Sequence, residues 1–260
     1  MLMLATFRIL GIISVIAFAT ALISSSPLLM QVEGAPTANY AHVRVPIAIS
    51  GDNVYLTWWD NKTGNNEVFF ARSTDNGKTF DTTINLSNAT GASADNEISA
   101  QGDNVYVTWW DNKTTNWEVF SRASTDGGET FNEAVMLKGL ADAPFKLSPP
   151  PRDRIAVDSL VASSENNQYV VWWDNKTGNW EVQFAKSADN GKTFGNTTNI
   201  SNSTDMNSIG ARIDADGNNV YITWFDTDIA TGEKNAFFRA SNDNGNAFGN
   251  RIMLNSTGTS

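Results

Sequence analysis

The chain has 260 residues and a formal net charge of -10, and it contains one histidine and no cysteine. This acidic balance argues against binding to a phosphate backbone, and the missing cysteines exclude disulfides and thiolate metal sites. His42 alone cannot build a histidine-rich zinc site. We therefore expect no nucleic-acid partner, no metal and no cofactor.

The first 34 residues are typical of an export signal. "MLMLATFR" carries one positive charge, Ile9 to Ile23 contains no charged residue, and Gly34 and Ala35 are small enough for a cleavage site. If the segment is retained, Ile9 to Val32 is uncharged and long enough to cross a bilayer. The sequence thus predicts a signal peptide or N-terminal membrane anchor over 1–34, and a mature chain that is secreted or held at the cell surface.

A repeat fills the rest of the chain. The stretch "GDNVYLTWWDNKTGNNEVFFARSTDNGKTF" begins at Gly51 and returns with edits from Gly102, Asn166 and Gly217. Four aspartates in register give spacings of 51, 63 and 54 residues: Asp75, Asp126, Asp189 and Asp243. About 50 residues is the length of one four-stranded propeller blade. We therefore predict one all-β domain over 36–260, a β-propeller of about four four-stranded antiparallel blades, with blades near 44–88, 95–138, 154–202 and 209–255.

The second copy shows where the strands of a blade are expected. We assign them to "EISAQ" (Glu97 to Gln101), "NVYVTWW" (Asn104 to Trp110), "WEVFSRAS" (Trp117 to Ser124) and "EAVML" (Glu133 to Leu137). In "VYVTWW" both alternating sets of side chains are largely apolar, so this strand is expected to be covered on both sides, as stacked blades require.

The segment after each third strand resembles the Asp box of bacterial neuraminidase repeats, which occurs in sialidases and other sialidase-like propellers. "STDNGKTF", "STDGGETF" and "SADNGKTF" match its Ser-X-Asp-X-Gly-X-Thr-Phe pattern, and "SNDNGNAF" departs at Ala247. In such a turn the Asp carboxylate accepts backbone N–H bonds, Gly supplies a positive φ and the aromatic ring closes the blade. The expected structural residues are Ser73, Asp75, Gly77, Phe80, Ser124, Asp126, Gly128, Phe131, Ser187, Asp189, Gly191, Phe194, Ser241, Asp243, Gly245 and Phe248.

Resemblance to sialidases also implies a set of catalytic parts: three arginines for the substrate carboxylate, a tyrosine nucleophile and an aspartate acid/base. "VRVP" at the start of the first blade is similar to the Arg-Ile-Pro motif of that family. Most tyrosines, glutamates and cations recur at fixed repeat positions, which favours packing roles over chemistry. If the chain is an enzyme, the candidates outside the repeat are Tyr40 as nucleophile, Arg44, Arg154 and Arg212 for carboxylate binding, and Asp153 or Asp158 as acid/base.

The loops after the second strands offer an alternative, non-catalytic site. Exposed members of the Trp pairs could stack on sugar faces while the aspartates that follow them accept hydroxyl hydrogen bonds. The candidate ligand-binding residues are Trp59, Asp60, Trp110, Asp111, Trp173 and Asp174. The same loops carry glycosylation sequons at Asn61, Asn112 and Asn175.

Three functions remain open on the sequence. The first is a non-catalytic module that binds a glycan or a surface protein, the second a sialidase-like glycoside hydrolase, and the third a purely structural surface glycoprotein. Glycans on the three loop sequons would favour the third, because they would cover the face that a substrate needs. The four copies are expected to form either a small closed ring or an open set of blades completed by another copy of the chain.

Overall fold

The computed structural model describes residues 45–114, 116–138 and 160–254. By its internal contacts the chain divides into Met1–Ala38 and Asn39–Ser260, and all the described residues belong to the second unit. The signal or anchor expected over 1–34 and His42 lie outside the described residues. Across the described ranges, no helix is long and apolar enough to span a bilayer.

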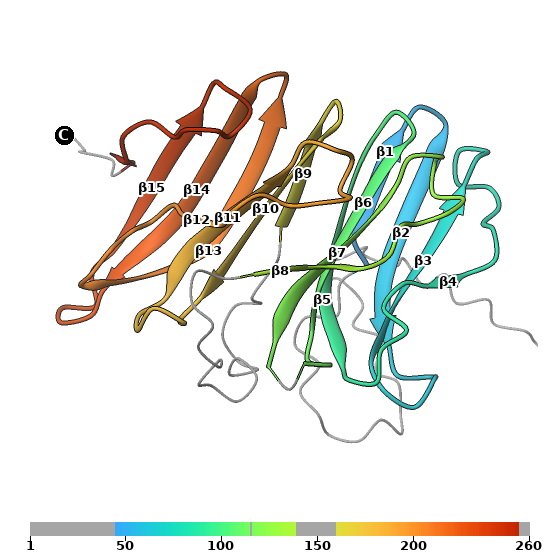
Figure 1. The fold of residues 1–260 in the computed structure, drawn as a ribbon, viewed down its shortest axis with the longest axis horizontal. Helices are drawn as coiled ribbons and strands as arrows, with labels where there is room; N and C mark the ends of the chain where they lie inside the picture. Colours follow the sequence, from blue (N-terminus) through green and yellow to red (C-terminus); the bar gives the residue numbers. More distant parts are fainter. Residues whose placement is uncertain (1–44, 115, 139–159, 255–260) are drawn as a thin grey trace, which may run out of the picture. The chain divides into compact units, whose positions relative to one another are not determined.

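Sixteen strands form four antiparallel sheets, one for each copy of the repeat. Within each sheet, strands that are neighbours in the sequence are hydrogen-bonded neighbours in space (Figure 1). The first sheet contains β1 (Ile47–Ser50), β2 (Asn53–Asp60), β3 (Glu67–Ser73) and β4 (Ile84–Asn85). The second contains β5 (Ser93–Gln101), β6 (Asn104–Asp111), β7 (Glu118–Ser124) and β8 (Val135–Leu137). The third contains β9 (Leu160–Ser164), β10 (Asn167–Asp174), β11 (Glu181–Ser187) and β12 (Thr198–Asn199). The fourth contains β13 (Met206–Asp216), β14 (Asn219–Asp228), β15 (Lys234–Ser241) and β16 (Ile252–Met253).

The prediction of an all-β chain with four-stranded antiparallel blades is confirmed. In the second copy the strands agree with the expected ones except at their ends, and the largest difference is the start of β5 at Ser93 instead of Glu97. A register shift between Ala94 and Glu97 explains this difference, because the strand pairs with β6 on both sides of a bulge. Each sheet packs on the next, and the first strands β1, β5, β9 and β13 contact one another in succession.

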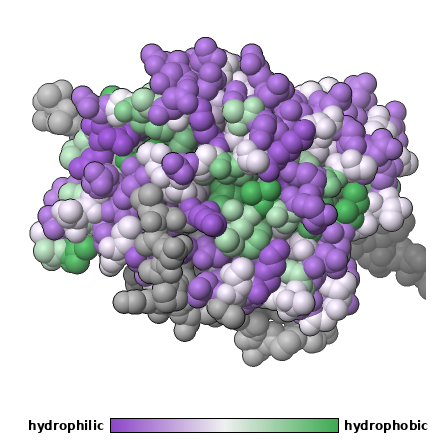
Figure 2. Space-filling view, in the orientation of Figure 1, coloured by the Kyte–Doolittle hydropathy of each residue, from purple (hydrophilic) through white to green (hydrophobic). Residues whose placement is uncertain are grey.

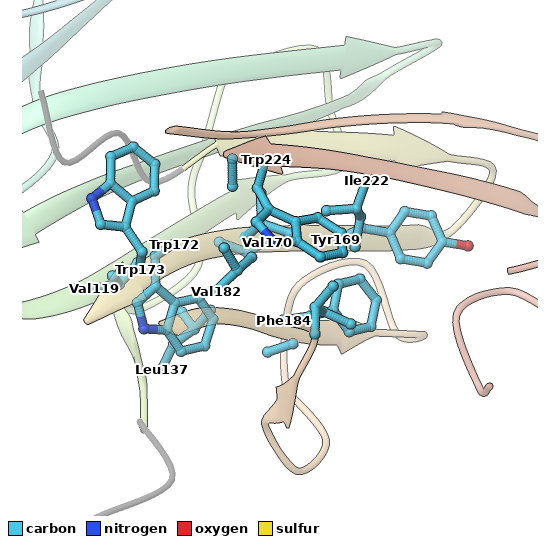
Figure 3. Close-up of a cluster of buried hydrophobic side chains, with 14 of the residues drawn as sticks. Val119, Leu137, Tyr169, Val170, Trp172, Trp173, Val182, Phe184, Ile222 and Trp224 are labelled. Atoms are coloured by element: carbon cyan, nitrogen blue, oxygen red, sulfur yellow. The ribbon is translucent and has the colours of Figure 1, made fainter. Parts of the chain in front are cut away.

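The second strands are covered on both sides, as expected from their composition. Trp109, Trp172 and Trp224 lie in the core on the side of the preceding sheet, and Trp110 and Trp173 lie on the other side. The cluster around β10 shows the arrangement, with Trp172, Trp173, Tyr169 and Phe184 among aliphatic side chains of the neighbouring sheets (Figure 3). Burial of these large rings is the main source of cohesion between sheets.

The box turns have the predicted hydrogen bonds. In the second copy, Ser124 Oγ donates to Asp126 Oδ1 at 2.6 Å and accepts from Gly128 N at 2.8 Å. Asp126 also accepts from the backbone N and the hydroxyl of Thr130, at 2.9 and 2.5 Å. Burial acts to raise the pKa of the Asp126 carboxyl, but the bonds from Ser124 and Thr130 outweigh it and lower the pKa to about 2. The glycines of the four turns all have φ between 71° and 81°, a conformation that disfavours any residue with a Cβ.

The box turn of one sheet closes the gap to the preceding sheet. The Phe131 ring meets Phe70 edge to face with centroids 4.9 Å apart, and Phe248 meets Phe184 at the same distance. Gly128 lies so close to Phe70 that a Cβ would be 2.6 Å from its Cζ. The repeated tyrosine of the second strand is fully buried in the first three sheets, as its repeat position predicts, but Tyr221 of the fourth sheet is 40% exposed.

The cations before the box turns occupy two positions, not the single repeat position that the sequence suggests. Arg72 and Lys186 project toward the next sheet and donate to box carbonyls there, Gly127 O at 3.2 Å and Asn244 O at 3.1 Å. Arg239 lies one place earlier in its strand and donates back to Ile200 O of the preceding sheet at 2.9 Å. Because side chains alternate along a strand, a shift by one residue moves the cation to the opposite face.

Candidate functional site

Each sheet has a loop end and a box end. The loop end carries the connections between second and third strands (61–66, 112–117, 175–180 and 229–233), and the box end carries the box turns. The loop end is held by buried glutamates in the first and third sheets. Glu181 is 2% exposed and accepts from Asn179 Nδ2 at 3.0 Å, from Ser203 N at 3.0 Å and from the hydroxyl of Ser201. These bonds tie the loop to the connection that leads into the next sheet, as Glu67 does with Asn65 and Ser87 in the first sheet.

The aspartates expected to bind a ligand instead shape these loops. Asp60 and Asp174 each accept from the backbone N of the lysine two residues later, at 2.9 and 3.1 Å, and Asp111 does so at 2.7 Å. Asp111 and Asp174 are buried, and Trp172 Nε1 donates to Asp174 at 3.1 Å. Burial raises the pKa of Asp174, and the bonds from the lysine N–H and the indole oppose that rise. The oxygens of Asp111 and Asp174 are thus buried and used within the chain, which argues against the predicted role of these two residues in ligand binding.

The Trp pairs do not supply an exposed platform in the middle sheets. Trp110 is 4% exposed and Trp173 is 2% exposed, so neither ring offers a face to a sugar. The next sheet covers them, which the apolar composition of these strands already indicates. Trp59 is half-buried, and so is Asp60, which forms an ion pair with Lys62 at 3.0 Å.

Two other tryptophans are half-exposed at the loop end. Trp117 and Trp180 immediately precede the third strands of their sheets and pack one side against the core cluster. The backbone N and O of Trp180 pair with Asn207 and Ser208 at the start of β13, at 3.2 and 2.8 Å, so its position is fixed between two sheets. The sequence analysis did not single out these two tryptophans, although the sequence contains a signal for them. The residue just before the third strand differs among the four copies, whereas most neighbouring positions agree: it is Asn66, Trp117, Trp180 and Lys234.

The first strand of the second sheet carries an unusual polar group at its bulge. Asp95 has φ 51°, in the left-handed region, and the corresponding residue of the fourth sheet is Gly210 with φ 67°. Asn96 beside it is 4% exposed, and within the described part of the chain neither its Oδ1 nor its Nδ2 has a hydrogen-bond partner. An unsatisfied buried amide costs about 1–3 kcal/mol, and the fourth sheet avoids this with Ala211. The second sheet thus retains a strained aspartate and an unpartnered asparagine where the fourth sheet has glycine and alanine.

The same repeat position differs in charge from copy to copy. Asp95 stands nine residues before Asn104, which opens the second strand, and Gly210 stands nine before Asn219. Counting back nine from Asn53 and Asn167 gives Arg44 and Asp158. A position that is basic, acidic, acidic and glycine within a close repeat is not explained by packing, which the other copies would share.

The predicted catalytic residues can be placed only in part. Tyr40, Arg44, Asp153, Arg154 and Asp158 lie outside the described residues. Arg212 is exposed on β13, on the face of the fourth sheet turned away from the third, and its Nη1 donates to its own neighbour Ala211 O at 2.9 Å.

The repeated tyrosines are unsuited to chemistry at the loop end. Tyr106 and Tyr169 extend toward the box end, where their hydroxyls lie 3.4 Å from Asn190 Oδ1 and Asn244 Oδ1. Burial raises the pKa of Tyr106 to about 12, which is the wrong direction for a nucleophile. The described residues also hold no group of three acidic or histidine side chains that could bind a metal ion.

The loop sequons differ in accessibility. Asn61 is exposed, whereas Asn112 is half-buried and its Oδ1 accepts from Ala92 N at 2.6 Å. Asn175 is half-buried, with its Oδ1 enclosed. Of the three predicted glycosylation sites, Asn61 is therefore the most open to modification.

Comparison with known proteins places this geometry among glycosidase propellers. No protein-family description and no curated protein matches the sequence. Among solved structures, the NanB sialidase of Streptococcus pneumoniae is similar with a TM-score of 0.51 and 12% identity, over 88% of this chain and 54% of the sialidase. The α-L-arabinanase of Penicillium chrysogenum, complexed with arabinobiose, gives a TM-score of 0.52 and 12% identity over 82% of this chain and 66% of the enzyme. The GH93 α-L-arabinofuranosidase of Fusarium graminearum gives 0.51 and 12% over 77% and 62%. This chain thus spans between half and two thirds of their length, and at such identities the likeness establishes the fold alone.

Proposed function

We propose that this chain, which has a sialidase-like β-propeller fold, is an exported module that binds a glycan at its loop end without hydrolysing it. The observation that carries the proposal is the bulge of β5, where Asp95 and Asn96 are retained at a cost in stability. A residue in a left-handed conformation and a buried polar group without a partner are both typical of functional sites.

Half-exposed aromatic rings support a sugar as the ligand. A sugar presents an apolar face of C–H groups and an edge of hydroxyls, so it needs a ring to stack on and fixed hydrogen-bonding groups. Trp117 and Trp180 offer the rings, each held by core packing on one side. Asp95, which is half-exposed at the bulge, offers a carboxylate for hydroxyls. The glycosidase propellers of the same fold act on sugars, which agrees with this ligand class.

The described tyrosines and carboxylates do not favour hydrolysis. The tyrosines of the repeat are directed to the box end, and Asp111 and Asp174 are used in loop hydrogen bonds. A sialidase-like hydrolase is the second candidate, favoured by the charge variation at the position shared by Arg44, Asp95 and Asp158. A structural glycoprotein is the third, and the open position of Asn61 is the feature in its favour.

The test is a binding and turnover experiment on the full chain in mild detergent. A glycan array would identify a sugar, and mass spectrometry would then follow release of monosaccharide from that sugar, a sialoside, an arabinan and a xylan. We expect binding without release. Release at a rate that scales with protein concentration would establish the hydrolase instead, and absence of both binding and release from folded protein would favour the structural role.

Tryptophan variants locate the binding surface. Trp117→Ala and Trp180→Ala should each weaken sugar binding about two- to tenfold, since stacking on an aromatic ring contributes about 0.5–1.5 kcal/mol. Trp58→Ala is the matched control, because Trp58 is also half-exposed but lies on the side of the first sheet turned away from the second. Equal losses in all three variants would place the site elsewhere.

A further inference from the structure

The outer faces of the first and last sheets are apolar and exposed. On the first sheet Ile47 is 58% exposed and Ile49 is 63% exposed, and both lie on the side turned away from the second sheet, beside Leu56 and Val54. On the fourth sheet Phe225 is 52% exposed and Tyr221 is 40% exposed, on the side turned away from the third sheet. Figure 2 shows that hydrophilic residues dominate the face it displays, with apolar residues gathered in patches.

These two faces carry the two halves of a contact that the chain makes twice internally. Between the first and second sheets, Phe70 and Tyr55 cover the box glycine Gly128 and the Phe131 ring. Between the third and fourth sheets, Phe184 and Tyr169 cover Gly245 and Phe248 in the same way.

The fourth sheet has the tyrosine and phenylalanine of this contact, but no box turn of a following sheet packs against them in the described chain. Tyr221 and Phe238 stack with centroids 6.2 Å apart, as Tyr55 and Phe70 do at 6.1 Å. Tyr55 is fully buried by the next sheet, whereas Tyr221 is exposed.

The first sheet has the box glycine and box phenylalanine of this contact, but no tyrosine and phenylalanine of a preceding sheet cover them in the described chain. Its box ring, Phe80, is 43% exposed, whereas Phe131 and Phe248 are partly buried against the preceding sheet. A Cβ at Gly77 would meet only Val54 of its own sheet, at 3.9 Å, whereas Gly128 and Gly245 are in close contact with a phenylalanine.

We propose that the outer face of the fourth sheet binds the outer face of the first sheet in a second copy of this chain. Tyr221 and Phe238 of one copy then cover Gly77 and Phe80 of the other, repeating the internal contact between copies. The interface is head to tail, so association either closes a ring or continues as a chain of copies.

The proposed interface resembles the internal contact most closely at the second and third strands, and less closely at the first strands. The residue that pairs with the repeated tyrosine is small in the first three sheets, Ala48, Ser99 and Ala162, but it is Asp214 in the fourth. On the opposing face the first strand carries Ile49. The second and third strands and the box turn therefore supply the apolar contact, and the first strands approach less closely than they do inside the chain.

Two single variants and their mixture test the proposal. In analytical ultracentrifugation of the full chain in mild detergent, the wild type should associate with rising concentration. Phe225→Asp blocks the fourth-sheet face and Phe80→Asp blocks the first-sheet face at its box turn, so each alone should weaken association at least tenfold. Mixed in equal amounts, the two variants should form a dimer that grows no further, because each still has the one face that the other lacks.

Controls separate this contact from other causes of association. Ile229→Asp makes the same change at a side chain that is 58% exposed in the loop after β14, and it should associate as the wild type does. The double variant Phe80→Asp/Phe225→Asp gives the level of association that arises outside these faces, including any from residues 1–34. The proposal is wrong if the wild type associates no more than this double variant, if either single variant associates as the wild type does, or if the mixture fails to dimerise.

Discussion

The box glycines permit a measurement of how much the contact between sheets contributes to stability. Gly77→Ala and Gly128→Ala are the same change in the same turn, at φ 80° and 81°. Both variants place a Cβ in the left-handed region, which costs about 1–2 kcal/mol. Only Gly128→Ala also forces the new methyl group to within 2.6 Å of Phe70 Cζ and 3.1 Å of its Cε1. Overpacking of this kind typically costs about 1–3 kcal/mol more.

We therefore expect Gly77→Ala to lower the free energy of unfolding by about 1–2 kcal/mol and Gly128→Ala by about 2–5 kcal/mol. Urea unfolding followed by tryptophan fluorescence would measure both, at a protein concentration where the chain is monomeric. Gly191→Ala should resemble Gly128→Ala, since its Cβ would lie 2.7 Å from Ala123 Cβ. Equal losses at Gly77 and Gly128 would refute the reasoning, because the contact between sheets would then add nothing to the backbone cost.

Two further predictions concern the buried and turn carboxylates. Because the pKa of Asp126 is lowered to about 2 in the folded chain, its carboxylate stabilises the fold above the usual Asp pKa of about 4 and loses this effect as the pH falls from about 4 to about 2. The stability deficit of Asp126→Asn in chemical unfolding should thus be largest near pH 7 and shrink over that interval, and a deficit independent of pH would contradict the assignment. Glu181→Ala should lower the free energy of unfolding by about 2–4 kcal/mol, because it leaves buried donors unsatisfied. Glu118→Ala removes an ion pair with Lys176 at 2.6 Å and should lower the free energy of unfolding by only about 1 kcal/mol. Calorimetry that finds the larger loss in Glu118→Ala would contradict the role given to Glu181 at the loop end.

The repeat made the fold predictable from sequence, because the same strand and turn signals occur four times in register. The box turn in particular could be worked out from its residue types, since Asp, Gly and Thr each have one evident role in it. The two positions of the cations could not be predicted in this way. Arg72 and Arg239 both precede a box turn, and only the strand pairing shows that they project to opposite faces.

The candidate site was harder to predict because burial depends on the neighbouring sheet. The sequence does not distinguish the burial of Trp110 from that of Trp117. The next sheet covers Trp110, whereas Trp117 lies at the end of the loop before β7 and remains half-exposed. Likewise, nothing in the letters of "SADNE" shows that Asp95 takes a left-handed conformation at a bulge. Variation between the copies was the useful signal for the candidate site. A position that differs among close repeats is not required for the packing that all the copies have in common.

The most direct test of sugar binding at the loop end is the affinity of Asp95→Gly for the glycan identified on the array, compared with Asn76→Gly. Asn76 also has a left-handed conformation, at φ 60°, but it lies in the box turn of the first sheet. Glycine relieves about 1–2 kcal/mol of strain and adds about 0.5–1 kcal/mol of chain entropy to the unfolded state, so neither variant should lose much stability. The account predicts that isothermal titration finds sugar binding at least tenfold weaker in Asp95→Gly and unchanged in Asn76→Gly. Unchanged binding in Asp95→Gly, from a folded protein, would contradict it.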